Sequence, residues 1–264
     1  MPEIAVGDIT LHYEQAGERG SPVLLLTGLG GVGRSWGPQI EFFGRDHRVF
    51  APDHRGAGRS TPAKDGYSIE RHAEDMAGLV RGLGCGPVHV VGLSTGGAIG
   101  QVMALDHKDT VATLTLASTW ARVDAYFRRQ MVGRKRTLVD SGLRAGAESN
   151  ALVLFSANYQ RNFPDRVEKW VDVTSSGDYH QDIALARIDM VLAHDQLDRI
   201  GAIACPVLIV AGTGDGCTPM YFAEELHRTI PGSEFTTLDA GHFSCLEKPE
   251  EFHRSVAEFI SRHE

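Results

Sequence analysis

A serine, an aspartate and a histidine follow one another along this chain of 264 residues, each just beyond an apolar run. Ser94 is the centre of the pentapeptide GLSTG, Asp215 follows the run PVLIVA, and His242 follows the run EFTTL. A serine hydroxyl attacks a carbonyl carbon when an imidazole takes its proton and a carboxylate holds the imidazole in place. The three side-chain types and their order along the chain therefore predict a serine hydrolase.

The residues around Ser94 predict a sharp turn from a strand at 87–91 into a helix at 97–107. Such a turn strains the backbone of the serine and leaves room only for small neighbours, which Gly92 and Gly96 provide. For the pentapeptide by itself, an ordinary loop is the alternative interpretation. Asp239 is an alternative acid, but it precedes His242 on the same strand end and would have to fold back, so we favour Asp215.

A second glycine-rich segment, GLGGVG at residues 28–33, follows a strand predicted at 23–27 and has two interpretations. It matches G-x-G-x-x-G, and Asp53 lies near the distance at which a dinucleotide fold places its ribose-binding acid. Two features oppose that interpretation: an antiparallel hairpin precedes the strand, and RSWGP at residues 34–38 is a poor start for the helix that must hold the pyrophosphate. The same glycines let a peptide N–H approach a substrate oxygen closely, as a hydrolase requires.

The elements that must position these residues form an alternating pattern. An antiparallel pair is predicted at 3–6 and 9–15, followed by apolar runs alternating with helical stretches. This alternation predicts an α/β fold, a mostly parallel twisted sheet with helices on both faces. Strand patterning stops between 120 and 200, where helix-period stretches are broken at Pro164 and at residues 175–177. We predict a core of residues 1–119 and 201–264 and an inserted helical lid of residues 120–200. The predicted parallel runs are 23–27, 47–51, 88–91, 113–116, 207–211 and 234–238.

Over nearly its whole length the chain resembles the α/β-hydrolase superfamily. The resemblance rests on DHRGAGRS at residues 53–60, on the acid-bearing segment 208–219 and on the histidine segment 240–252. It implies that the backbone N–H groups of Leu29 and Thr95 form the oxyanion hole. Thr27 stands where many relatives have histidine, which leaves the backbone donor intact. Within the superfamily the chain is similar to small bacterial 3-oxoadipate enol-lactonases, aminoacrylate-type hydrolases and cofactor-free bromoperoxidase-like esterases.

The same resemblance makes the acid and arginine of residues 53–55 structural, tying neighbouring turns together. For the substrate pocket, the expected residues come from the glycine loop, the predicted lid and the histidine loop: Gly28, Gly30, Trp120, Tyr126, Arg122 and Phe243. The many arginines of the first lid helix are expected to form a solvated face, although one or two pointing inward would bind a substrate carboxylate. The lid aromatics are expected to serve more as the lid's own core than as pocket walls.

Composition narrows the classes of partner. With 26 Lys and Arg against 34 Asp and Glu, the net charge of −8 argues against binding to nucleic acid or to an anionic membrane. The amino-terminal residues lack the pattern of a signal peptide, so a cytoplasmic location is expected. Four scattered cysteines predict reduced thiols, and the histidines lack metal-site spacing, so we expect no metal and no cofactor. A homodimer is left open.

We therefore expect a serine hydrolase acting on a small ester, enol-lactone or activated amide. Three alternatives stay open, and the first two would use the same triad. One is a hydrolase that cleaves a carbon–carbon bond in a ring-fission dienoate. Another is a cofactor-free perhydrolase or haloperoxidase. The non-enzyme alternative is a ligand receptor built on a hydrolase frame.

Overall fold

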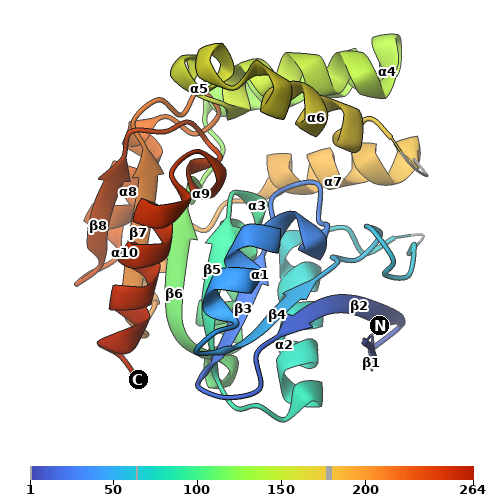
Figure 1. Cartoon of the computed structure of the whole chain (residues 1–264). Helices are drawn as coiled ribbons and strands as arrows, with labels where there is room; N and C mark the ends of the chain where they lie inside the picture. The colour runs from blue at the N-terminus through green and yellow to red at the C-terminus, as the bar shows by residue number, and fades with distance from the viewer. Residues whose placement is uncertain (1, 64, 177–179) are drawn as a thin grey trace.

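The computed structural model describes residues 2–63, 65–176 and 180–264, and within these ranges an eight-stranded sheet forms the centre of the molecule (Figure 1). The strands, in chain order, are β1 (Glu3–Val6), β2 (Ile9–Ala16), β3 (Pro22–Leu26), β4 (Arg48–Pro52), β5 (Val88–Leu93), β6 (Val111–Ala117), β7 (Val207–Gly212) and β8 (Glu234–Leu238). Across the sheet they are ordered β1-β2-β4-β3-β5-β6-β7-β8. β1 pairs antiparallel with β2, and β2 with β4, while the strands from β4 to β8 pair in parallel. The predicted hairpin and mostly parallel sheet are confirmed.

Helices cover both faces of this sheet, as predicted. The helical elements are η1 (Gly33–Trp36), α1 (Gly37–Phe43), α2 (Ile69–Leu83), α3 (Thr95–Asp106), η2 (Lys108–Thr110), α4 (Ala125–Leu154), α5 (Ala157–Asn162), α6 (Pro164–Thr174), α7 (Gln181–Ala193), η3 (Ile200–Ala202), α8 (Met220–Thr229), α9 (Ser244–Glu247) and α10 (Pro249–Ser261). α2, α3 and α8 contribute to the core on one face, and α1 and α10 to the core on the other. β3, β5 and β7 are buried at every position because both of their faces are covered.

Local sequence signals explain several helix boundaries. The side chain of Ser68 caps the first turn of α2, and Gly84 ends that helix in the left-handed conformation with φ 60°. Pro164 begins α6, as its fixed φ favours, so the predicted break there marks a helix start. The other predicted break, at residues 175–177, falls at the end of α6, and Gly177 lies outside the described residues.

Four helices, α4 to α7, lie between β6 and β7 in the chain, and we call this segment the helical insertion. In Figure 1, α4, α5 and α6 form the upper layer of the molecule, and α7 lies below them. α4 is interrupted at Gly142, where φ 80° and ψ −175° are not helical. The insertion falls within the predicted boundaries 120–200, but the division into domains and the function of a lid remain predictions.

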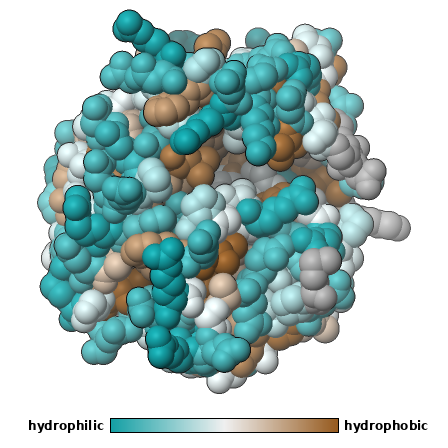
Figure 2. Space-filling view, in the orientation of Figure 1, coloured by the Kyte–Doolittle hydropathy of each residue, from teal (hydrophilic) through white to brown (hydrophobic). Residues whose placement is uncertain are grey.

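The surface is largely hydrophilic, and Figure 2 shows apolar side chains in a recess beneath the upper layer of helices. None of the helices in the described ranges combines the length and the apolar composition that crossing a lipid bilayer requires.

Candidate active site

Ser94 occupies the turn between β5 and α3 in a conformation that few residues adopt, with φ 55° and ψ −117°. A Cβ atom on Gly92 would lie 2.5 Å from the carbonyl oxygen of Gly96, and one on Gly96 would lie 2.1 Å from that of Leu26. Both glycines are therefore required by the close approach of backbone segments. A strained residue of this kind costs about 1–3 kcal/mol, which the surrounding packing must offset.

The loops after β5, β6, β7 and β8 leave the same edge of the sheet. The N–H of Ser94 donates to Ala117 at the end of β6 (2.9 Å), and the N–H of Thr213 after β7 donates to Leu238 at the end of β8 (2.9 Å). β6 and β7 are paired in parallel between these points. Ser94, Asp215 and His242 thus lie on loops at one edge, the carboxyl end of the parallel strands, where α/β sheets bind their ligands.

Asp215 and His242 form a buried pair. The distance from His242 Nδ1 to Asp215 Oδ2 is 2.9 Å, and the two side chains are 2% and 1% exposed. Oδ1 of the carboxylate accepts the backbone N–H groups of Cys217 and Thr218, each at 2.8 Å. Because an ionised carboxylate only accepts, Nδ1 must carry the imidazole proton, which leaves the lone pair on Nε2. The pair therefore presents a base.

Thr218 was missed by the sequence analysis. Its hydroxyl donates to Asp215 Oδ2 at 2.7 Å and lies 3.2 Å from His242 Nδ1, so it contacts both members of the pair. Its place three residues after Asp215 was the available signal. The alternative acid, Asp239, is exposed, and the hydrogen bond of Nδ1 goes to Asp215 instead.

In the structure, the hydroxyl of Ser94 is not hydrogen-bonded to the imidazole of His242. Within the described residues, the Oγ of Ser94 makes no hydrogen bond, although the serine is largely buried at 8% exposure. Catalytic hydrogen bonds are often long in ligand-free enzymes and shorten when substrate binds.

The glycine loop of residues 28–33 lies beside Ser94. A Cβ atom on Gly28 would be 3.5 Å from the Cβ of Ser94, so the loop and the serine are within van der Waals contact of one another. In the described part of the chain, the N–H groups of Leu29 and Thr95 donate to no other residue. Both are therefore available as oxyanion donors.

Asp53 does not serve a ribose here. Its Oδ1 accepts the N–H of Gly33 (2.7 Å) and its Oδ2 accepts the N–H of Arg59 (2.8 Å), so the carboxylate ties the glycine loop to its own turn. Arg55 pairs with Asp75 at 2.8 Å. A short 3-10 helix, η1, also follows the glycines where a dinucleotide fold needs an α-helix. These contacts favour the structural interpretation of this segment.

Residues 21–249 match the sequence model of the α/β hydrolase fold. The chain belongs to this family. It is 34% identical over 261 residues to RutD of Azorhizobium caulinodans, a candidate carbamate hydrolase, with 98% of each chain covered. The enol-lactonase of Burkholderia xenovorans LB400 is 29% identical with a TM-score of 0.91, covering 98% of this chain and 100% of that one. A thermophilic esterase of Thermogutta terrifontis is 30% identical with a TM-score of 0.89, and both chains are covered in full, 100% each. The chain is thus a hydrolase of this fold.

The structure places the six expected pocket residues in different surroundings, and their role in a pocket stays a prediction. Gly28 lies beside Ser94, and the ring of Phe243 lies 5.8 Å from that of His242. Trp120 is fully buried against Phe127 in the core. Of the other expected pocket residues, Arg122 pairs with Glu225 at 3.3 Å, Tyr126 donates its hydroxyl to the carbonyl of Gly216 at 2.7 Å, and a Cβ on Gly30 would contact nothing within 4 Å.

On the first helix of the insertion, Arg128, Arg129 and Arg136 are exposed, as the solvated-face expectation predicts. Arg134 departs from it, because this side chain is half-buried and donates from Nε to Oδ1 of Asn150. The aromatic rings of the insertion pack on one another, with Phe155 stacked on Tyr159 at 5.5 Å and edge-on to Trp170 at 5.4 Å. They form a small core of the insertion, which Phe243 joins from the histidine loop.

One arginine that the sequence analysis missed does reach the hydrolase loops. Arg187 of α7 donates from Nε and Nη2 to the carbonyl of Leu29 (3.0 and 2.8 Å), and from Nη1 to the carbonyl of Arg55 (2.8 Å). Burial lowers the pKa of its guanidinium to about 10, so it stays charged at neutral pH. The available signal was a single arginine within the apolar stretch IALARIDMVLA.

Cys217 lies on the acid loop and Cys245 in α9, directly after the histidine loop, and both are buried. Burial raises the pKa of each thiol to about 12, so both remain protonated and serve as packing groups. Across the described ranges, His, Cys, Asp and Glu side chains form no group of three that could hold a metal ion.

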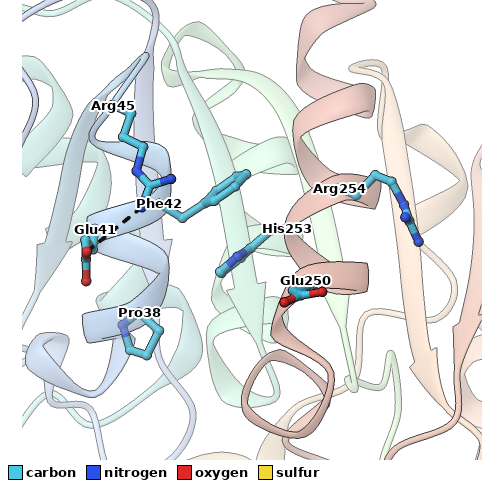
Figure 3. A pocket seen from close by; sticks show the side chains of 7 residues that line it. All are labelled: Pro38, Glu41, Phe42, Arg45, Glu250, His253 and Arg254. Carbon is cyan, nitrogen blue, oxygen red and sulfur yellow. Dashed lines mark ion pairs between the residues drawn. The ribbon is translucent and has the colours of Figure 1, made fainter.

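A hollow of about 440 Å³ lies elsewhere, between α1 and α10 (Figure 3). Phe42 stacks on His253 at 4.2 Å, and charges of both signs surround the two rings. The hollow contains none of Ser94, Asp215 and His242, so it is separate from the candidate active site. Its lining consists of Pro38, Glu41, Phe42, Arg45, Glu250, His253 and Arg254.

Proposed function

We propose that this hydrolase cleaves a small ester, enol-lactone or activated amide through Ser94, His242 and Asp215. The observation that carries the proposal is the buried hydrogen bond from His242 to Asp215, which leaves Nε2 as a base at the sheet edge where Ser94 sits on its strained turn. Nucleophilic catalysis requires a base held in one tautomer at the same edge of the sheet as the serine of the turn.

The proposed reaction has two steps, acylation of Ser94 and hydrolysis of the acyl-serine. Ser94 Oγ attacks the carbonyl carbon while its proton passes to Nε2 of His242, and the N–H groups of Leu29 and Thr95 bind the developing oxyanion. The tetrahedral species collapses as the leaving group takes the proton from Nε2, which gives an acyl-serine. Water then attacks the acyl carbon with His242 as base, and release of the acid regenerates Ser94.

The substrate class is supported by what the relatives have in common. The names carbamate hydrolase, enol-lactonase and esterase all denote a carbonyl carbon bonded to an oxygen or nitrogen leaving group. The small exposed fraction of Ser94, 8%, favours a small acyl group that fits beneath the helical insertion. Carboxylated enol-lactones, carbamates and acylated enamines form the first set of compounds to screen.

The test compares wild type with Ser94→Ala on p-nitrophenyl acetate and butyrate. Without a nucleophile, only binding and oxyanion stabilisation remain, so kcat should fall about 10⁴-fold or more. A fluorophosphonate should add one phosphonyl group to wild type, and peptide mass spectrometry should locate it on Ser94. Ser255→Ala, a change on the distant α10, is the matched control and should be labelled like wild type.

Equal activity in Ser94→Ala and wild type, or an adduct on another residue, would refute the proposed role of Ser94. Disappearance of a coloured dienoate without release of an alcohol or amine would instead support the carbon–carbon alternative. Bromination of a dye in the presence of peroxide, acetate and bromide would support the perhydrolase alternative.

A further inference from the structure

Arg187 uses its entire guanidinium group to join α7 of the helical insertion to two loops of the core. Nε and Nη2 converge on the carbonyl oxygen of Leu29, and Nη1 reaches the carbonyl oxygen of Arg55. The two remaining N–H groups face imidazole nitrogens, with Nη1 3.4 Å from His72 Nε2 and Nη2 3.5 Å from His54 Nδ1. All five donors of the side chain thus face acceptors.

Both imidazoles must be neutral to accept. His72 Nδ1 lies 2.8 Å from the carbonyl oxygen of Ser68 and donates to it, which leaves the lone pair on Nε2 facing Arg187. Burial and the nearby guanidinium keep the pKa of both histidines below the usual range. The arginine is therefore held by neutral acceptors only.

A carboxylate partner is missing from this arrangement. Among residues 2–63, 65–176 and 180–264, no Asp or Glu oxygen lies within 4.0 Å of the Arg187 guanidinium. The neighbouring Arg55, whose carbonyl oxygen lies 2.8 Å from Arg187 Nη1, forms ion pairs with two carboxylates, those of Asp8 and Asp75. Burying a cation without a carboxylate partner lowers the free energy of unfolding, so stability alone does not explain an arginine at this position.

The contact of Arg187 with the glycine loop is close and directional. Gly31 adopts φ 70°, and a Cβ atom there would lie 2.4 Å from Nη2, so the loop turns directly against the guanidinium. With its carbonyl oxygen bound from two sides, Leu29 has a defined peptide orientation, while its own N–H donates to no described residue. Gly28, on the other side of Leu29, lies against Ser94.

From this geometry we infer that Arg187 is a positioning residue: from the helical insertion it holds the glycine loop so that the N–H of Leu29 faces the oxyanion formed at Ser94. The inference rests on the proposed function of Ser94. Because Arg187 belongs to α7, the oxyanion hole is complete only when α7 is packed against the core. Packing of the insertion on the core is therefore required for catalysis. A misplacement of about 1 Å in such a donor reduces turnover about 100-fold.

The experiment uses Arg187→Lys and Arg187→Met with the neutral ester p-nitrophenyl butyrate. A lysine keeps the cation but cannot bind Leu29 and Arg55 at once, and a methionine keeps the volume without donors. We expect kcat to fall about 10- to 100-fold in both variants while KM changes less than about 3-fold. Ile188→Val, a buried change at the next position of α7, is the matched control and should retain wild-type kcat.

A second readout is independent of catalysis. In protein labelled with ¹⁵N-leucine, the amide of Leu29, assigned through Leu29→Ile, should shift and exchange faster in Arg187→Lys than in wild type. This result should appear even if Ser94 is not the nucleophile, so failure of the inference and failure of the proposed function are distinguishable.

Two outcomes would overturn the inference. One is a folded Arg187→Lys with wild-type kcat and an unchanged Leu29 amide. The other is a loss restricted to substrates that carry a carboxylate, with neutral esters unaffected, because Arg187 would then bind the substrate.

Discussion

At the scale of single residues, the contacts of Thr218 predict how a substitution at this position should change kcat. Its hydroxyl bonds the carboxylate of Asp215 and contacts Nδ1 of His242, so it fixes the angle between them. A hydrogen bond to a charged group contributes about 1.5–3 kcal/mol. Thr218→Val, which keeps the shape, should therefore lower kcat about 10- to 100-fold with little change in KM, measured by steady-state kinetics.

Thr218→Ser is the matched control, because it restores the hydroxyl while removing only a methyl group. It should recover most of the lost kcat. If the serine variant is as slow as the valine variant, packing of the methyl group matters at this position and the hydroxyl does not.

At the scale of elements, the helical insertion is hydrogen-bonded to three parts of the candidate site: the glycine loop, the acid loop and the segment that follows His242. Arg187 of α7 holds the glycine loop, and Gln130 of α4 donates to the carbonyl of Gly216 on the acid loop at 2.8 Å. On the histidine side, Glu247 of α9 accepts from the N–H of Ser156 (2.8 Å) and from its hydroxyl (2.6 Å). Ser156 also caps α5, so one carboxylate secures the start of that helix.

The bond between Glu247 and Ser156 predicts local opening when it is removed. Glu247→Ala should accelerate hydrogen exchange of amides 155–160 and lower Tm by about 2–5 °C, because two hydrogen bonds to a partly buried carboxylate are lost. Amides of α3 should be unaffected. Mass-spectrometric hydrogen exchange measures both regions.

Glu258→Ala is the control for charge, since Glu258 is exposed on α10. It should leave exchange at 155–160 at the wild-type rate. An identical exchange pattern in Glu247→Ala and Glu258→Ala would contradict the proposed anchoring role.

At the scale of the whole molecule, buried histidines make folding sensitive to acid. Burial lowers the pKa of His72 to about 3 and that of His194 to about 4, and it holds that of His54 well below its usual range. In the unfolded chain the same groups titrate near 6.5. As pH falls below about 6.5 the unfolded state binds protons that the folded state excludes, so the free energy of unfolding decreases.

This effect should be visible in urea unfolding at pH 7 and pH 5. Each such histidine contributes a loss of about 2 kcal/mol over that interval. His194 is suited to this test because its two ring nitrogens have no hydrogen-bond partner within the described residues. His194→Gln should lose about 2 kcal/mol less than wild type between the two pH values, and an equal loss in both proteins would contradict the assignment.

What the sequence could predict depended on how local the information was. The turn at Ser94 and the apolar runs of the sheet leave signals within a few residues, and the predicted strand 234–238 matches β8 at both ends. β6 extends past its predicted run, to Val111 and Ala117, because pairing with β5 continues beyond the strongly apolar residues. The contact of Arg187 with Leu29 joins positions 158 residues apart, and no periodicity records it.

The backbone at Ser94 has a consequence for protein engineering. A residue with φ 55° is held there by its neighbours, and glycine would adopt the same geometry without strain. Selection of variants for heat resistance alone would therefore favour glycine at position 94, and with it a better-folded protein that has lost its nucleophile. For this chain, any search for thermostability must be coupled to a screen for turnover, because the two properties compete at the same residue.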